Sequence, residues 1–137
     1  MKLNRYMISG IAMFTASVCA ASPYQLSTHI LDINKGKPAA DVQVELYKLN
    51  NENGNWQKIA KNITDKNGRI AEFLPIQEGL NNNGVYKLKF QVKDYFDRLQ
   101  EQSFYPFVEV SFELNDRSHY HVPITLSPYG YSTYRGR

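Results

Sequence analysis

Two of the three histidines in the chain lie one residue apart, in the segment "HYHVP" near the C-terminus. In an extended strand, residues i and i+2 point to the same face, so the imidazoles of His119 and His121 would lie side by side. A neutral imidazole can take a proton from water, because histidine titrates near pH ~6.5. By pattern alone each of these histidines is more typical of a surface group than of a catalyst. Together they are candidates for acid–base chemistry.

The third histidine and one arginine extend this candidate set. His29 lies in "QLSTHILDI", where alternation places it on one face with Ser27 and Leu31, and Arg69 begins the predicted strand "RIAEF" directly after a turn. By pattern alone, His29 and Arg69 are also more typical of surface groups than of catalysts. The sequence contains no G-x-S-x-G motif and no glycine-rich phosphate loop. The function does not follow from these residues alone.

A zinc site is the competing interpretation of the histidines, since three of them can bind the metal and leave a position open for water. The His-x-His spacing is common by chance, however, and no clustered carboxylates accompany it. The only cysteine is Cys19, which lies in the N-terminal segment predicted to be removed as a signal peptide. We therefore predict no metal, no other cofactor, no disulfide and no cysteine nucleophile.

The N-terminal residues have the composition of a secretory signal. Lys2 and Arg5 precede an uncharged stretch over 7–20, and "VCAA" offers small residues for cleavage after Ala20 or Ala21. The apolar run is shorter than the roughly 20 residues that span a membrane, although a retained N-terminal anchor is the alternative. We predict a signal peptide over 1–20, one domain over 21–137, and a periplasmic or otherwise exported protein.

Removal of this segment makes the protein nearly neutral. The formal net charge of +3 includes two cations and no acidic residue from positions 1–20, so 3 − 2 leaves +1 for the remainder. Proteins that bind nucleic acid or anionic membranes carry a basic surplus. We therefore expect neither nucleic acid nor, after signal removal, a membrane as partner.

Strands must position the candidate residues, because period-two alternation of apolar and polar residues dominates the remaining chain. The clearest segments are 41–49, 85–92, 104–114 and 119–127. In the last of these, the apolar face is formed by Tyr120, Val122, Ile124 and Leu126. His119 and His121 then point away from the core.

Turns rich in asparagine and glycine separate these segments, and the Asn67-Gly68 pair predicts a hairpin between the strands on either side of it. One stretch, 94–101, has a different pattern, with Asp94 as an N-cap and Phe96 and Leu99 at helical spacing. About seven or eight strands with a single short helix favour an antiparallel β-sandwich over a barrel.

The chain resembles the 5-hydroxyisourate hydrolases of the transthyretin-like family. The resemblance rests on four segments: "LSTHILD" (26–32), "GKPAADVQVEL" (36–46), "TDKNGRI" (64–70) and "HYHVPITLSPYGYSTYRG" (119–136). It implies an all-β, transthyretin-like β-sandwich of two four-stranded sheets with one short helix at 94–101. It also implies a homotetramer, a dimer of dimers, with active sites in the channel where the dimers meet.

The resemblance further implies a site. Its catalytic residues would be His29, Arg69 and His121, and Tyr134 would join His29 and Arg69 in binding substrate. The supporting residues would be His119, Arg135 and Gly136. The expected reaction is hydrolysis of 5-hydroxyisourate, the product of urate oxidation, to 2-oxo-4-hydroxy-4-carboxy-5-ureidoimidazoline in purine catabolism. Either histidine could be the general base.

One residue departs from the family pattern. Arg137 stands where family members end in serine, so a bulky cation would lie close to the site.

Two other functions stay open. The alternatives are a small-ligand carrier like transthyretin and an exported binding protein without activity. Such carriers lack the histidine and arginine set and the Tyr-Arg-Gly tail, which this chain has.

Overall fold

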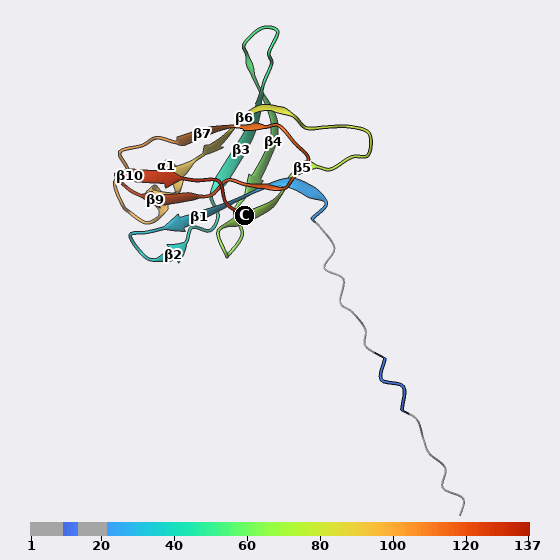
Figure 1. Cartoon of the computed structure of the whole chain (residues 1–137). Helices are drawn as coiled ribbons and strands as arrows, with labels where there is room; N and C mark the ends of the chain where they lie inside the picture. Colours follow the sequence, from blue (N-terminus) through green and yellow to red (C-terminus); the bar gives the residue numbers. More distant parts are fainter. Residues whose placement is uncertain (1–9, 14–21) are drawn as a thin grey trace, which may run out of the picture.

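The computed structural model describes residues 10–13 and 22–137. Most of the predicted signal peptide therefore lies outside the described residues. The remaining chain forms two packed β-sheets with one short helix, as the alternation of apolar and polar residues predicts (Figure 1).

The first sheet is antiparallel throughout and has the strand order β4-β3-β6-β7. Its strands are β3 (Gln43–Leu49), β4 (Trp56–Ile63), β6 (Gly84–Phe90) and β7 (Val108–Leu114). The hairpin that joins β3 to β4 extends beyond the body of the sandwich (Figure 1). The two edges of this sheet are formed by β4 and β7.

The second sheet is built around β1 (Tyr24–Asp32). Antiparallel to β1 run β2 (Lys37–Pro38) and β5 (Arg69–Pro75), while β8 (Tyr120–His121) and β9 (Ile124–Ser127) pair with it in parallel. The strand β10 (Gly130–Thr133) pairs with β9 and forms the edge. The described chain thus has ten strands, more than the seven or eight expected, because this sheet contains short separate segments.

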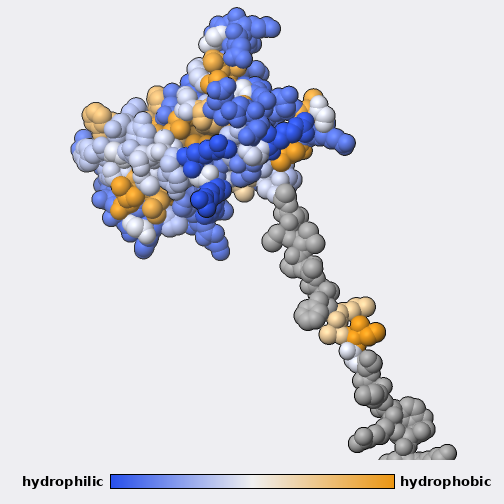
Figure 2. All heavy atoms as spheres, viewed as in Figure 1, coloured by the Kyte–Doolittle hydropathy of each residue, from blue (hydrophilic) through white to orange (hydrophobic). Residues whose placement is uncertain are grey.

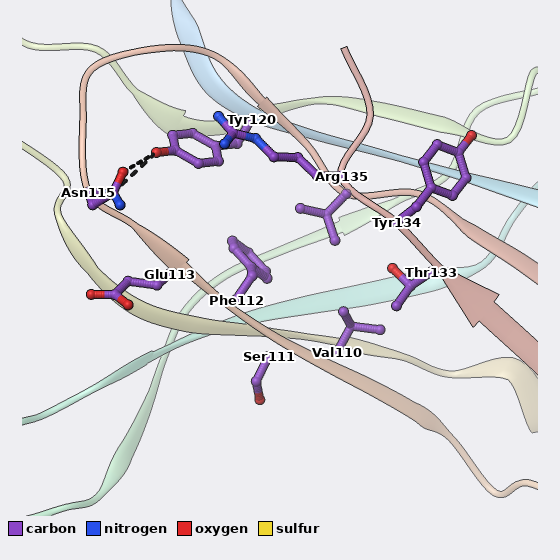
Figure 3. A pocket seen from close by; sticks show the side chains of 10 residues that line it. Val110, Ser111, Phe112, Glu113, Asn115, Tyr120, Thr133, Tyr134 and Arg135 are labelled. Atoms are coloured by element: carbon purple, nitrogen blue, oxygen red, sulfur yellow. Dashed lines mark hydrogen bonds between the residues drawn. The ribbon is translucent and has the colours of Figure 1, made fainter.

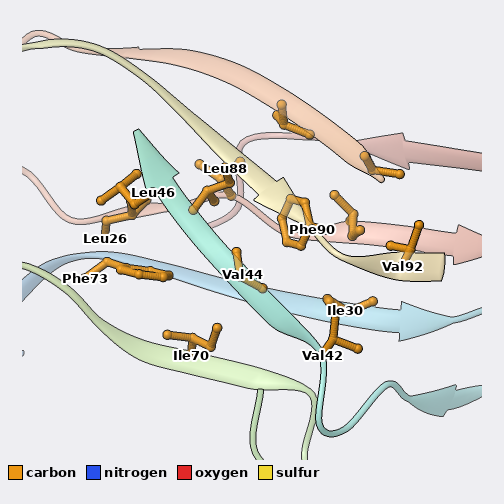
Figure 4. Close-up of a cluster of buried hydrophobic side chains, with 14 of the residues drawn as sticks. Leu26, Ile30, Val42, Val44, Leu46, Ile70, Phe73, Leu88, Phe90 and Val92 are labelled. Atoms are coloured by element: carbon orange, nitrogen blue, oxygen red, sulfur yellow. The ribbon is translucent and has the colours of Figure 1, made fainter. Parts of the chain in front are cut away.

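Apolar side chains from both sheets fill the space between them (Figure 4). Leu26 and Ile30 of β1 face Val44, Leu46 and other residues of the opposite sheet, and all four are fully buried. The predicted alternation in the C-terminal segment is confirmed, since Tyr120, Val122, Ile124 and Leu126 are at most 5% exposed. The alternate residues of β1 and β8 therefore point away from the core.

The helix α1 begins earlier than predicted, at Val92, and ends at Arg98. Asp94 lies in its first turn rather than at the N-cap, a position taken by Gln91 without a side-chain hydrogen bond. Burial of Val92 and Phe96, both 0% exposed, anchors the helix more strongly than a surface cap could. The left-handed backbone of Gln100 (φ 57°) then ends the helical segment.

Two further predictions were wrong in detail. The strand expected over 104–114 begins only at Val108, and Phe104 is 71% exposed. Pro106 has no backbone N–H and so cannot extend the ladder with β6. The Asn67-Gly68 turn forms, but β4 and β5 belong to different sheets instead of one hairpin.

The surface in the view of Figure 2 is mainly hydrophilic, with separate groups of apolar side chains. The large apolar residues that are more than half exposed within 22–137 are Ile33, Ile63, Leu80, Phe104, Tyr129 and Tyr134. Across residues 10–13 and 22–137, no helix is both long and apolar enough to cross a membrane.

Candidate active site

The pairing of β1 with its neighbours brings the three predicted catalytic residues together. His29 lies directly opposite Arg69 of β5, and two residues earlier Ser27 lies opposite His121 of β8. Ser27 and His29 share the face of β1 that points away from the core, so all four residues lie on one side of the sheet. Both histidines are half-buried, whereas Arg69 is exposed.

The surroundings favour the neutral form of both histidines. Burial lowers the pKa of His121, and the positive charges of Arg69 and His29 lower it further. Burial and the Arg69 charge likewise lower the pKa of His29, partly offset by hydrogen bonding to the backbone of Asn67 and by the Asp65 carboxylate. Each imidazole therefore keeps an unprotonated ring nitrogen near pH 7, as a general base requires.

Ser27 connects the two histidines of the C-terminal segment. Its Oγ lies 2.9 Å from Nε2 of His119 and 2.8 Å from Nδ1 of His121, while Nδ1 of His119 donates to the Tyr24 carbonyl oxygen at 2.9 Å. The sequence placed Ser27 on the same face as His29 but gave it no role. Only the parallel pairing of β1 with β8 shows that its hydroxyl lies between two imidazoles.

A tight turn sets the position of Arg69. The Asp65 carboxylate accepts hydrogen bonds from the backbone N–H groups of Asn67 (2.8 Å) and Arg69 (3.0 Å). Gly68 has a φ of +72°, and a Cβ at this position would lie 2.6 Å from the Ile30 carbonyl oxygen. Because only glycine fits against the backbone of β1, the turn holds Arg69 at the start of β5, opposite His29.

The C-terminal tail returns to the same sheet at Gly136. The backbone N–H of Gly136 donates to the His121 carbonyl oxygen at 2.7 Å, and a Cβ on this residue would lie 2.5 Å from Cδ2 of the His121 ring. Gly136 therefore packs directly on the imidazole, where a larger residue would displace one of the two.

The other two tail residues face a different hollow within the single chain. Tyr134 and Arg135 line a cavity of about 280 Å³ together with residues of β7 and β8 (Figure 3). The Arg135 guanidinium lies 4.5 Å from the centre of the Tyr120 ring, and Tyr134 is 60% exposed. Arg69 instead lines a shallow hollow with Ser27 and His119. The structure thus brings Gly136, but not the side chains of Tyr134 and Arg135, to the histidines.

The donor set offers little to a metal ion. Among residues 10–13 and 22–137, no three side chains of the His, Cys, Asp or Glu types are grouped so as to bind one. Two of the three histidines also hydrogen-bond to Ser27. The arrangement is instead suited to hydrolysis, in which a neutral imidazole activates water beside a guanidinium that stabilises an oxyanion.

Comparison with known proteins places this arrangement in a family. Residues 26–136 match the model of the HIUase/Transthyretin family. A 5-hydroxyisourate hydrolase of Halalkalibacterium halodurans is 45% identical over 118 residues, which cover 82% of this chain and 97% of that protein.

Two solved structures have the same fold as this chain. One is a 5-hydroxyisourate hydrolase of Klebsiella pneumoniae, 34% identical with a TM-score of 0.69, covering 83% of this chain and 94% of its own. The other is sea bream transthyretin in complex with thyroxine, 32% identical with a TM-score of 0.73 over 82% and 94% of the two chains. The backbone alone therefore does not separate a 5-hydroxyisourate hydrolase from a transthyretin that binds thyroxine.

Proposed function

Because this chain belongs to the HIUase/Transthyretin family, we propose that it is a hydrolase that opens the ring of 5-hydroxyisourate in urate degradation. The grouping of these three side chains favours an enzyme over a carrier: His29, Arg69 and His121 lie on one face of adjacent strands. Binding of an apolar ligand has no need of two neutral imidazoles beside a guanidinium. Addition of water to a carbonyl group uses both kinds of group.

The reaction follows from the properties of these three side chains. Arg69 binds an oxygen of the substrate and stabilises the negative charge that develops when water adds to the ring carbonyl carbon. One imidazole takes a proton from the attacking water. The ring C–N bond then breaks, the departing nitrogen accepts a proton from the imidazolium, and the former carbonyl becomes a carboxylate. The product is 2-oxo-4-hydroxy-4-carboxy-5-ureidoimidazoline.

The active protein is a homotetramer, a dimer of dimers, in this proposal. Support comes from the sheet edges: within the described chain β7 pairs only with β6, and β10 only with β9. Strand edges and exposed aromatic residues such as Tyr129 and Tyr131 are suited to contacts between copies. In such an assembly, Tyr134 and Arg135 line a site with the histidines of another subunit.

The place of action is the periplasm or another exported compartment. Support for export lies in the sequence of 1–20, with its two cations, uncharged stretch and small residues before Ser22. N-terminal sequencing of the secreted protein tests this, and a mature chain that still begins at Met1 would contradict export by cleavage.

The direct test is the ultraviolet absorbance of freshly generated 5-hydroxyisourate, which decays slowly in buffer. We expect the purified mature protein to accelerate this decay greatly, with the buffer decay subtracted as a blank. Thyroxine binding measured by calorimetry on the same preparation tests the carrier function. Tight thyroxine binding without acceleration of the decay would reject the hydrolase, and native mass spectrometry that finds only monomers would reject the tetramer.

A further inference from the structure

In each hydrogen bond around Ser27, the donor and the acceptor follow from the chemistry of the two groups that the bond joins. The Tyr24 carbonyl oxygen can only accept, so the ring hydrogen of His119 must lie on Nδ1, which donates to it at 2.9 Å. In a neutral imidazole the other nitrogen carries no hydrogen. In the neutral state of His119, Nε2 is therefore an acceptor, and the hydroxyl hydrogen of Ser27 points to it over 2.9 Å.

His121 is the next group in this series of hydrogen bonds. A hydroxyl has one hydrogen, and that of Ser27 is already directed to His119, so toward His121 the Ser27 oxygen can only accept. The 2.8 Å contact then requires a hydrogen on Nδ1 of His121. A neutral ring with its hydrogen on Nδ1 has its lone pair on Nε2. In isolated histidine the Nε2–H form is the more common one, so the cluster reverses the usual preference.

We propose that Ser27 is a positioning residue that holds His121 in the Nδ1–H tautomer, and that His121, through Nε2, is the general base that activates water. This proposal rests on the proposed function and sharpens it, because it assigns the proton transfer to one of the two histidines. His119 acts through Ser27, as the group that orients the hydroxyl. The Tyr24 carbonyl, a backbone group of β1, is the fixed end of the series.

The proton balance of the step is complete with these groups. Water loses one proton to Nε2 of His121 as its oxygen bonds to the carbonyl carbon. The imidazolium keeps its Nδ1–H bond to Ser27, so neither the serine nor His119 changes protonation. The proton on Nε2 then passes to the departing ring nitrogen when the C–N bond breaks, and His121 returns to the starting tautomer.

Nuclear magnetic resonance tests the tautomer without any assay. The chain has three histidines, so protein labelled with ¹⁵N in the imidazole rings gives three ring systems, assigned from single His→Gln variants. At pH 7.5 we expect His121 to show a protonated Nδ1 and an unprotonated Nε2. In Ser27→Ala we expect the pattern to reverse to Nε2–H. A wild-type His121 that carries its hydrogen on Nε2 would overturn the proposal, and this measurement requires no variant of Ser27.

Kinetics supply the second measurement. Because a ring in the wrong tautomer cannot act as base, Ser27→Ala should lower kcat on 5-hydroxyisourate roughly 10-fold to 100-fold with little change in KM. Ser27→Thr keeps the hydroxyl and should restore most of the rate and the Nδ1–H tautomer. Gln57→Ala, on the exposed side of β4 in the other sheet, is the control, and thermal unfolding of each variant checks the fold.

The outcomes separate this proposal from the site on which it rests. Loss of activity in His121→Ala together with a fully active Ser27→Ala would overturn the role of Ser27 alone. Full activity in His121→Ala would instead reject the proposed catalytic site, whatever tautomer the ring adopts.

Discussion

Strand β1 carries two polar clusters, one near each end, and they differ in how completely their atoms are bonded. At its C-terminal end Asp32 is fully buried and accepts hydrogen bonds from the Tyr95 hydroxyl (2.7 Å) and from the N–H groups of Asn34 (3.0 Å) and Lys35 (3.1 Å). Nearer the N-terminal end, Ser27 joins two imidazoles on a face that reaches solvent.

The difference shows how one strand serves both stability and chemistry. Both carboxylate oxygens of Asp32 have protein donors, and burial together with this carboxylate raises the pKa of Tyr95. With both oxygens bonded within the protein, such a cluster stabilises the fold. At Ser27 the contacts use Nδ1 of His121, which leaves Nε2 for an outside molecule. We call the Asp32 cluster closed and the cluster of Ser27, His119 and His121 open. We expect substitutions at the two clusters to affect different measurements.

Substitution of His121 tests the open cluster and should give the largest effect. We expect His121→Ala to lower kcat/KM for 5-hydroxyisourate by about 10²–10⁴-fold, because the group that exchanges protons with water is lost. The midpoint of thermal unfolding should change little, since the ring is only half-buried. Absorbance decay measures the rate, and Gln57→Ala on the exposed side of β4 is the control. Equal rates in the two variants would remove His121 from the site.

Substitution of Asp32 tests the closed cluster. Asp32→Ala leaves the buried Tyr95 hydroxyl and two backbone N–H groups without their acceptor, which should cost about 2–4 kcal/mol of unfolding free energy. Urea denaturation followed by fluorescence measures this cost. Asp97→Ala removes an exposed carboxylate that pairs with Lys93 at 2.9 Å, and it should cost less than about 1 kcal/mol. Similar costs for the two variants would show that the buried Asp32 cluster stabilises the fold no more than a surface ion pair does.

Substitution of Gly136 tests how the tail contacts the open cluster. In Gly136→Ala the new methyl group would collide with Cδ2 of His121, and such overpacking costs about 1–3 kcal/mol when neighbours must move. We expect a loss of roughly tenfold in kcat/KM, the equivalent of ~1.4 kcal/mol. Stability should fall less than in Asp32→Ala, because the tail is at the chain end. An alanine variant with the wild-type rate would show that the tail can move away without consequence.

The pH profile tests the charge state of the open cluster. Burial and the Arg69 charge lower the pKa of His29 and His121, and the neutral imidazole is the active form. The rate should therefore be constant near pH 7 and fall about tenfold per pH unit below an apparent pKa that lies under ~6.5. Arg69→Gln removes one of the charges and should move this acidic limb to higher pH. An acidic limb of the rate profile centred above pH 7 in the wild type would contradict the lowered pKa of these two histidines.

The smallest effect is expected at Arg137, the residue that departs from the family pattern. It is exposed, and exposed charges contribute at most about 1 kcal/mol to their neighbours. Arg137→Ser should change kcat/KM by less than about fivefold. The same absorbance assay decides this, and a larger change would show that the terminal cation takes part in the site.

The sequence by itself determined the class of fold and the outward direction of the candidate residues. In a strand that lies between core and solvent, alternate residues face opposite sides. Because Tyr120 and Val122 are apolar and buried, His121 between them must face outward. Predictions from local sequence pattern were wrong where contacts with distant parts of the chain determined the structure. The helix begins at the buried Val92 rather than after Asp94, and the Asn67-Gly68 turn joins two sheets because β5 pairs with β1.

Only the tertiary structure decided which residues meet. The spacing between His29, Arg69 and His121 along the chain gives no information about strand order, which depends on how two sheets bury their apolar faces against each other. Ser27 illustrates the point: its hydroxyl gains a role only because β8 runs parallel to β1 and places two imidazoles within hydrogen-bonding distance. The direction of each hydrogen bond then follows from chemistry that no sequence pattern records.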